Sequence, residues 1–365
     1  MDECLGFVVE WFDPNAQINR LYLLKYFTHN NTVEMVEKKS RRLYLKRTKA
    51  GPEFAPEGLF VGGVVQLLGR TLTVKEYADV YTRSKKSSEA EKAFALVTPD
   101  AYAHLGRILS ALEADESGLT LSRMRMVQFS AGAAKGFYSS CWGEGGGDAQ
   151  HLASNPCVGI ELQGLDAVAR ASEIGSELRS RLSAGGAAEA VRVAGSVEEA
   201  ARCASFFFGE QQQGAAAGLG ATATFDSCTC CVIRPHAVRA GHVGAIVDMV
   251  LAQGYEISAM RLLRLQEVEA REFLEVYDGV VPTYRESVAE LTSGPAVALE
   301  IRAEDAVRSF RAMCGPWDVE MARELRPLTI RAKFGEDIVK QGVHCTDLDK
   351  DGEAECRYIF ETLVA

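Results

Sequence analysis

The sequence predicts an α+β protein, in which a small β-rich N-terminal region precedes two copies of one α/β unit. Three observations predict this fold class: an internal repeat over residues 93–363, strand-like segments interleaved with helix-like ones, and short β-prone runs separated by turns before residue 88. A chain of 365 residues has room for two or three domains of ordinary size.

The N-terminal region, residues 1–88, consists of short β-prone runs punctuated by turn residues. The turns are expected at Asp13–Asn15, Gly51–Pro52 and Pro56–Gly58, because Pro, Gly, Asp and Asn favour tight turns. The expected strands are Leu5–Trp11, Arg20–Phe27, Thr32–Val36 and Leu43–Thr48. The polar run Arg83–Glu89 marks the end of the region.

Two copies of one domain follow, at residues 93–209 and 227–363. Three segments of the first copy match three of the second in the same order and at nearly the same spacing, which argues against chance similarity. The matched pairs are Phe94–Ala101 with Cys230–Ala237, Ser154–Leu162 with Ser293–Ile301, and the aromatic runs Phe206–Phe208 with Tyr358–Phe360, which are expected to be closing strands. The stretch 210–226 between the copies is rich in small residues and is predicted to be a linker.

The second copy alternates strands with helices. Apolar runs rich in β-branched residues predict strands, whereas apolar residues three or four apart predict helices. The expected strands are Cys230–Ile233, Ile257–Leu265 and Ala296–Ile301, and the expected helices are His242–Ala252, Val268–Tyr277, Arg285–Leu291 and Ala303–Cys314. Elements interleaved at this density predict one sheet covered by helices.

Composition and charge argue against several classes of protein. The net charge of −10 disfavours a general nucleic-acid-binding protein. Neither a secretory signal nor an apolar run of about 20 residues is found, so no membrane partner is expected. The ten cysteines are scattered as in reduced intracellular proteins. Cys228, Cys230 and Cys231 are the tightest group, but no second pair follows at zinc-site spacing, which favours a cysteine-rich strand over a metal site.

The second copy carries a set of motifs that resembles the nucleoside diphosphate kinases. That family has a strand ending in K-P-D-x-x-x-R, then S-G-P, R-x-x-x-G, T-x-R and N-x-x-H-G-S-D. In the same order this chain has Arg234–Arg239, Ser293–Pro295, Arg311–Gly315, Thr329–Arg331 and Gln341–Asp347. The resemblance spans about Thr229 to Phe360, and it is specific because several motifs fall at family-like spacing.

This resemblance implies a phosphoryl-transfer site in the second copy. His344 matches the histidine that is phosphorylated, and Glu355, eleven residues later, matches the carboxylate that orients it. Arg311 and Arg331 match arginines that grip phosphates, and Thr346 takes the position of a serine hydroxyl. Mg²⁺ is expected only together with bound ATP or another nucleoside di- or triphosphate, and no other metal site is expected.

Departures from the family pattern leave open whether the second copy turns over nucleotides. Arg234 replaces a lysine that contacts phosphate, and Gln341 replaces an asparagine that binds the sugar. Trp317 falls near the position of a small threonine that contacts phosphate, and Leu274 is the nearest match to a tyrosine that supports the pocket. Because arginine is larger than lysine and its fork has a different geometry, we expect a residual nucleotide-binding site that includes Arg234 and Gln341, with at most weak kinase activity.

The first copy lacks this chemistry and is predicted to be a pseudoenzyme. Thr98 stands where the lysine belongs, and Arg192 falls near the histidine position. The segment between Leu162 and Arg192 is too short for the family's nucleotide-side loop. The run Gly145–Gly147 lacks the preceding strand and the following Gly-Lys-Ser/Thr of a phosphate loop, and it is predicted to be a flexible loop.

The N-terminal region resembles the DM10 domain, a small PH-like β-domain, through Trp11–Pro14, Arg20–Tyr26 and Leu45–Arg47. DM10 domains occur in ciliary and microtubule-associated proteins. The region also holds a basic cluster within an acidic chain, made of Lys38, Lys39, Arg41, Arg42, Lys46, Arg47 and Lys49. The cluster is either a solvated surface or, through Lys38, Lys39, Arg41 and Arg42, a contact with an anionic partner.

A DM10 domain followed by two kinase-type copies, the first degenerate, resembles a ciliary group within the nucleoside diphosphate kinase family. The resemblance implies that both copies are ferredoxin-like sandwiches, packed on each other as separate subunits pack in other members. It implies a cytoskeletal protein of the ciliary or flagellar axoneme that binds tubulin and other microtubule inner proteins inside doublet microtubules; relatives are linked to the gamma-tubulin ring complex. The alternative is an active nucleoside diphosphate kinase that transfers the γ-phosphate of ATP through a phosphohistidine at His344.

Overall fold

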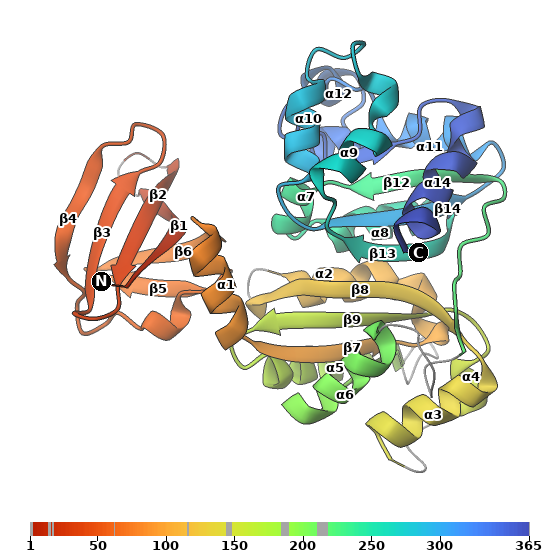
Figure 1. Cartoon of the computed structure of the whole chain (residues 1–365), viewed down its shortest axis with the longest axis horizontal. Coiled ribbons are helices and arrows are strands. Elements are labelled where there is room, and N and C mark those ends of the chain that lie inside the picture. The colour runs from red at the N-terminus through yellow and green to blue at the C-terminus, as the bar shows by residue number, and fades with distance from the viewer. Residues whose placement is uncertain are drawn as a thin grey trace.

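The computed structural model describes residues 3–13, 16, 18–61, 63–114, 117–143, 148–183, 190–209 and 218–364. Figure 1 shows an N-terminal sheet on the left and two α/β units stacked on the right. The predicted α+β class is confirmed, with an antiparallel six-stranded sheet first and strands covered by helices after it. None of the helices in the described part of the chain combines the length and the apolar character needed to span a membrane.

The N-terminal sheet has the strand order β4-β3-β2-β1-β6-β5, and its neighbouring strands are antiparallel. Side chains alternate between its two faces, so that Leu5, Phe7 and Val9 enter one core. The polar run predicted to end the region is helical, since the Asp79 side chain caps the helix by accepting from Thr82 N. The elements are β1 (Cys4–Asp13), β2 (Ile18–Phe27), β3 (Thr32–Glu37), β4 (Leu43–Lys49), η1 (Pro56–Gly58), β5 (Val64–Leu67), β6 (Arg70–Tyr77) and α1 (Val80–Glu89).

In both copies strands and helices alternate in the same order, and one or more helical segments follow each strand. The first copy has β7 (Glu91–Val97), η2 (Pro99–His104), α2 (Leu105–Glu113), β8 (Leu119–Phe129), α3 (Ala131–Cys141), α4 (Ala149–Leu152), β9 (Cys157–Gly164), α5 (Ala167–Ser183), β10 (Val191–Val193) and α6 (Val197–Phe208). The second copy has β12 (Cys228–Ile233), α7 (Pro235–Arg239), α8 (Val243–Ala252), β13 (Glu256–Leu263), α9 (Glu267–Phe273), η4 (Glu275–Tyr277), α10 (Tyr284–Leu291), β14 (Ala296–Arg302), α11 (Ala306–Cys314), α12 (Val319–Leu325), α13 (Ile330–Phe334), β15 (Val343–Cys345), η5 (Asp349–Asp351), α14 (Gly352–Phe360) and η6 (Thr362–Val364).

The two copies form one continuous sheet in the order β10-β7-β9-β8-β13-β14-β12-β15. They meet where β8 pairs with β13, with Arg125 opposite Arg261. Helices α2 and α8 cross at this junction with almost no space between their backbones, because a Cβ added to Gly244 would lie 2.1 Å from the backbone nitrogen of Ser110. Buried side chains of both copies therefore share one hydrophobic core, and each strand edge at the junction is covered by the other copy.

The aromatic runs predicted to be closing strands lie instead in helices. Phe206–Phe208 ends α6 and Tyr358–Phe360 ends α14. Ser196 caps α6 by accepting from the backbone N–H of Glu199, and Cys203, Ala204 and Phe207 then recur at helical spacing on its buried side. Capping and the 3.6-residue period outweigh the β-propensity of consecutive aromatics, and the closing strands are the shorter β10 and β15 upstream.

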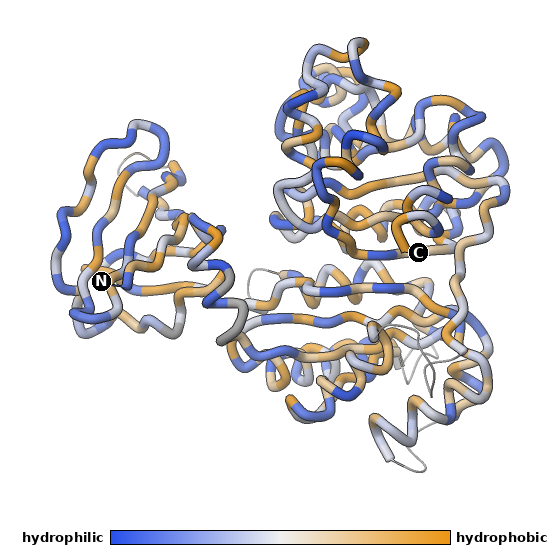
Figure 2. Tube along the Cα trace, in the orientation of Figure 1, coloured by the Kyte–Doolittle hydropathy of each residue, from blue (hydrophilic) through white to orange (hydrophobic). Residues whose placement is uncertain are grey.

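Part of the predicted linker is ordered against both copies. Leu219–Gly220 forms β11, which pairs with β8 of the first copy. Thr224 and Phe225 further along donate their backbone N–H groups to the Glu300 side chain of the second copy. Residues 210–217 of this stretch and the predicted loop Gly145–Gly147 lie outside the described residues. In the tube of Figure 2, hydrophobic segments alternate with hydrophilic ones in the N-terminal sheet and in both copies.

Candidate active site

His344 and Glu355 form the centre of the candidate site. His344 lies on β15, opposite Val232 of β12, and α14 brings Glu355 beside it. The Nε2 atom of His344 lies 2.9 Å from Glu355 Oε2. Because a carboxylate accepts at Nε2, the proton of the neutral ring is held there and Nδ1 keeps the lone pair that a nucleophile needs.

Thr346 supports this pair. Its hydroxyl donates to Glu355 Oε2 over 2.9 Å and accepts from the backbone N–H of Cys230 over 3.0 Å. The Thr346 hydroxyl thus orients the Glu355 carboxylate, and that carboxylate in turn orients the His344 ring. The structure brings together these three predicted residues, and the arrangement matches the orienting role that the motif implies for Glu355.

An aromatic wall closes the pocket over the histidine, whose residue surface is only 1% exposed. The ring of Phe273 stands edge-on to the imidazole at 4.8 Å between centroids, and that of Tyr277 lies 6.2 Å away. Trp317 packs against Tyr277 at 5.6 Å. A ligand can therefore reach the histidine only if part of this wall moves.

Tyr277, and not Leu274, supplies the tyrosine of the pocket. Leu274, the nearest match by alignment, is buried in the hydrophobic core of the second copy. The chain passes from α9 into the short turn η4, which carries the tyrosine three positions beyond the aligned residue. The Tyr277 hydroxyl donates to Asp347 Oδ2 over 2.6 Å. One signal was present in the sequence, because Tyr277 follows Phe273 by four residues and both reach the histidine.

Arg311 and Arg331 are both occupied by protein groups. Arg311 donates to the carbonyl of Asp347 over 2.9 Å and pairs with its carboxylate at 3.1 Å. Arg331 is buried, donates to the Gly315 carbonyl over 2.9 Å, and lies 3.4 Å from the Cys345 sulfur. A hydrogen bond from Cys314 lowers the pKa of Cys345, burial opposes this, and the charge of Arg331 adds to the lowering. The Cys345 sulfur therefore lies beside the guanidinium that the motif predicts to contact phosphate.

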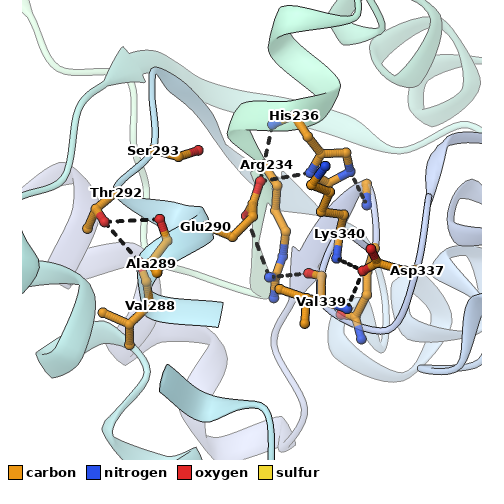
Figure 3. A network of polar contacts seen from close by, with 12 residues as sticks. Arg234, His236, Val288, Ala289, Glu290, Thr292, Ser293, Asp337, Val339 and Lys340 are labelled. Atoms are coloured by element: carbon orange, nitrogen blue, oxygen red, sulfur yellow. Dashed lines mark hydrogen bonds and ion pairs between the residues drawn. The ribbon is translucent and has the colours of Figure 1, made fainter. Parts of the chain in front are cut away.

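Arg234, predicted to contact phosphate, belongs to a buried network with Glu290 and His236 (Figure 3). Its Nη1 donates to the Val339 carbonyl over 2.8 Å and lies 3.7 Å from Glu290 Oε2. His236 donates its backbone N–H and Nδ1–H to Glu290 Oε1, over 3.1 and 2.8 Å, because its Nε2 accepts from Gly342 N. Burial lowers the pKa of Arg234, and Glu290 opposes that shift. Arg234 is therefore held inside the domain by Val339 and Glu290. Its position in the motif did not predict these contacts.

Gln341 is also turned inward. Its amide nitrogen donates to the carbonyls of Trp317 and Ile338 over 3.0 and 2.9 Å. Gln341, which is predicted to bind the sugar, therefore holds the backbone carbonyl of Trp317 instead. In this conformation Arg234, Arg331 and Gln341 all donate to backbone carbonyls of the protein. A nucleotide with its Mg²⁺ can use these donors only if they give up those contacts.

The equivalent position in the first copy is occupied by a stacked arginine. Arg192 lies opposite Leu96 in the β10–β7 pair, as His344 lies opposite Val232 in the β15–β12 pair. Its guanidinium lies 5.3 Å from the Tyr138 ring centre and 4.6 Å from that of Trp142. Arginine stays protonated in proteins and is no nucleophile, so this copy has no phosphoryl acceptor at the family position.

The predicted contact residues Lys38, Lys39, Arg41 and Arg42 lie in the turn between β3 and β4, here called the basic turn. Figure 1 places this end of the N-terminal sheet away from the two copies. Lys38 pairs with Glu76, while Lys39, Arg41 and Arg42 are exposed. The turn therefore presents a concentrated positive charge to an outside partner.

Comparisons with known proteins agree with these observations. The family model described as "Nucleoside diphosphate kinase" matches residues 227–363. A rat protein named nucleoside diphosphate kinase homolog 7 is 36% identical over 376 residues, which cover 99% of this chain and 94% of the relative, and the mouse homolog 7 matches to the same extent. The nucleoside diphosphate kinase of Aquifex aeolicus is 35% identical over 135 residues, covering 37% of this chain and 94% of that protein. A crystal structure of that enzyme covers 38% of this chain and 96% of its own, at 34% identity with a TM-score of 0.36.

Proposed function

The chain belongs to the family of nucleoside diphosphate kinase homolog 7, and from that premise we propose that it is a structural protein of ciliary or flagellar axonemes, bound inside doublet microtubules. In this proposal the N-terminal sheet is a PH-like DM10 domain, and the two copies are ferredoxin-like sandwiches that serve as binding modules. Its partners are tubulin and other microtubule inner proteins, with the gamma-tubulin ring complex as a further partner in the cytoplasm.

The closure of both family sites is the observation that carries this proposal. In the first copy the nucleophile position holds Arg192, stacked between Tyr138 and Trp142. In the second copy His344 is 1% exposed and packs against Phe273 and Tyr277, and Arg331 is engaged by protein groups. A domain that keeps its fold while its site is filled by its own side chains is better suited to binding a partner than to turnover.

The charge distribution supports an anionic partner at the basic turn. The chain as a whole is acidic, with a net charge of −10, yet Lys39, Arg41 and Arg42 lie exposed together in this one turn. The tubulin surface is strongly acidic, so this turn can orient the protein on a microtubule wall through long-range attraction.

Axonemal fractionation tests the proposal. The tagged full-length chain is expressed in a ciliated cell, and isolated cilia are demembranated and then washed with concentrated salt. We expect the protein to stay with the doublet microtubules and to leave only when the doublets themselves are dissolved. Recovery in the membrane-plus-matrix fraction or in the salt wash would refute the structural role.

The second candidate function is an active nucleoside diphosphate kinase, with Mg²⁺ and nucleotide as cofactor and substrates. The geometry of His344 and Glu355 favours it, because a ring nitrogen held in the nucleophilic tautomer is what phosphoryl transfer requires. Transfer of phosphate from ATP to GDP is then expected, and His344→Ala must abolish it. Turnover that survives this substitution would come from a contaminating enzyme and would remove support for the second function.

A further inference from the structure

Each copy buries a glutamate at an equivalent place in its sheet, and the first copy neutralises it with cations. Glu161 of β9 lies opposite Phe94, as Glu300 of β14 lies opposite Cys230. The first of these carboxylates accepts from Arg123 Nε over 3.0 Å and pairs with Lys92 Nζ at 3.3 Å. Two side-chain cations thus compensate for the burial of this charge.

The second copy buries Glu300 completely, at 0% exposure, without such cations. Its partners among the described residues are neutral donors: the backbone N–H groups of Thr224 and Phe225 and the hydroxyls of Thr224 and Ser258, at 2.6 to 3.3 Å. The repeat explains the difference, since Cys228 occupies the position of Lys92 and Ala259 that of Arg123. The place of a lysine ammonium is taken by a thiol.

A second thiol reaches the same carboxylate from another element. Helix α14 carries Cys356, and the ligand atoms of Cys228, Glu300 and Cys356 all lie within 4.8 Å of one another. Two thiolates on one zinc ion, each about 2.3 Å from the metal, are less than about 4.6 Å apart, so one ion can contact all three groups after small shifts. Cys230 lies two residues after Cys228 in β12 and packs in the same buried cluster as Cys228 and Cys356.

We propose that Cys228, Cys356 and Glu300 bind one thiophilic divalent cation of the zinc type, with Cys230 as an additional sulfur ligand. The cation takes the place that Lys92 and Arg123 hold in the first copy, and its binding releases the protons of the coordinating thiols. The donors on Glu300 act as the outer hydrogen bonds that fix a ligating carboxylate. Cys228 is 7% exposed, so the site borders the surface.

The site has a predicted pH dependence. A thiol must lose its proton to coordinate the metal, so affinity for the metal rises as pH rises.

Metal binding by the full-length chain tests this proposal. The reduced protein is incubated with Zn²⁺ and desalted, and metal per chain is measured by mass spectrometry; Cd²⁺ titration then reports sulfur ligation through the cadmium–thiolate charge-transfer band. We expect one equivalent, weakened at least about tenfold by Cys228→Ser or Cys356→Ser. Cys157→Ser, at a buried cysteine of β9 in the first copy, must leave binding unchanged.

The repeat itself provides a variant that separates metal binding from folding. Cys228→Lys restores the residue type of Lys92 beside the buried carboxylate, so it must abolish metal binding while the protein still melts cooperatively at or above the wild-type temperature. The proposal is overturned if the wild-type chain retains no stoichiometric metal, if both serine variants bind as the wild type does, or if Cys228 and Cys356 are recovered as a disulfide that excludes metal.

Discussion

The guanidinium of Arg331 lies 5.5 Å from the centre of the Trp317 ring. A cation held over an indole is attracted by the negative face of the ring, and the other contacts of Trp317 add to this restraint. Tyr277 packs against the ring and Gln341 holds the backbone carbonyl. Trp317, which the motif places near a phosphate-contacting threonine of the family, is therefore held by Arg331, Tyr277 and Gln341.

Trp317→Thr is predicted to open the site to nucleotides. Threonine restores the small hydroxyl residue of the family and frees one face of Arg331, so affinity for Mg²⁺-ADP is expected to rise at least about tenfold, equivalent to about 1.4 kcal/mol. Isothermal titration of the full-length chain measures it. Trp142→Thr is the matched control, because Trp142 stacks on Arg192 in the first copy. Equal affinities in wild type and Trp317→Thr would show that Trp317 is not the barrier.

Glu290→Gln is predicted to destabilise the second copy. The change removes the carboxylate that faces buried Arg234 and accepts from His236. Loss of one member of a buried ion pair costs about 3 kcal/mol, which denaturant unfolding can resolve. Glu286→Gln, an exposed position on the same helix, should change stability by less than about 0.5 kcal/mol. If Glu290→Gln unfolds at the same denaturant concentration as the wild type, the network contributes nothing to the stability of the folded state.

Stability is predicted to fall as pH rises from acid to neutral, through Glu113. Burial raises the pKa of this carboxyl from 4.5 to about 7, although it accepts from the Gly244 and Val243 N–H groups. A raised pKa means that the folded state binds more protons, so this contribution is complete below pH 4.5 and is lost as pH passes through 7. The full effect is up to about 3 kcal/mol. Glu113→Gln should flatten the pH profile of unfolding over this window, and an unchanged slope would refute the assignment.

Charge reversal of the basic turn is predicted to weaken axonemal retention. Lys38, Lys39, Arg41 and Arg42 are replaced by glutamate together, and the fraction that resists a salt wash is measured. A control reverses the same number of charges at exposed arginines on the two copies, namely Arg181, Arg271, Arg308 and Arg357. Retention should fall only for the basic turn; equal retention of both variants would reject this contact.

Much of the fold followed from local patterns. The repeat predicted two similar units because Phe94–Ala101 and Cys230–Ala237 both read as a buried strand followed by proline, and both form a strand and a helix start. The aromatic run Phe206–Phe208 was misplaced because three consecutive aromatics satisfy the strand preference, whereas the Ser196 cap and the helical spacing before the run decide the outcome.

The sequence predicted the residues of the site that belong to the motif, but not the residues from other elements that contact them. His344 and Glu355 were identified through the resemblance of their motif to the kinase family, and the structure places them 2.9 Å apart. The partners of Arg234 were not foreseen, because Glu290 and His236 approach it from other elements and no local pattern records that contact. The same holds for Cys356, which is far from Cys228 in sequence but joins it when α14 packs on β12.

Phosphorylation of His344 is the measurement that tests the closed-site account most directly. The full-length chain is incubated with γ-labelled ATP and Mg²⁺, and acid-labile phosphate per chain is counted for the wild type, Trp317→Thr and the corresponding His344→Ala variants. We predict labelling far below one phosphate per chain in the wild type and a His344-dependent gain in Trp317→Thr. Labelling of the wild type to nearly one phosphate per chain, abolished by His344→Ala, would contradict a closed site and establish the kinase instead.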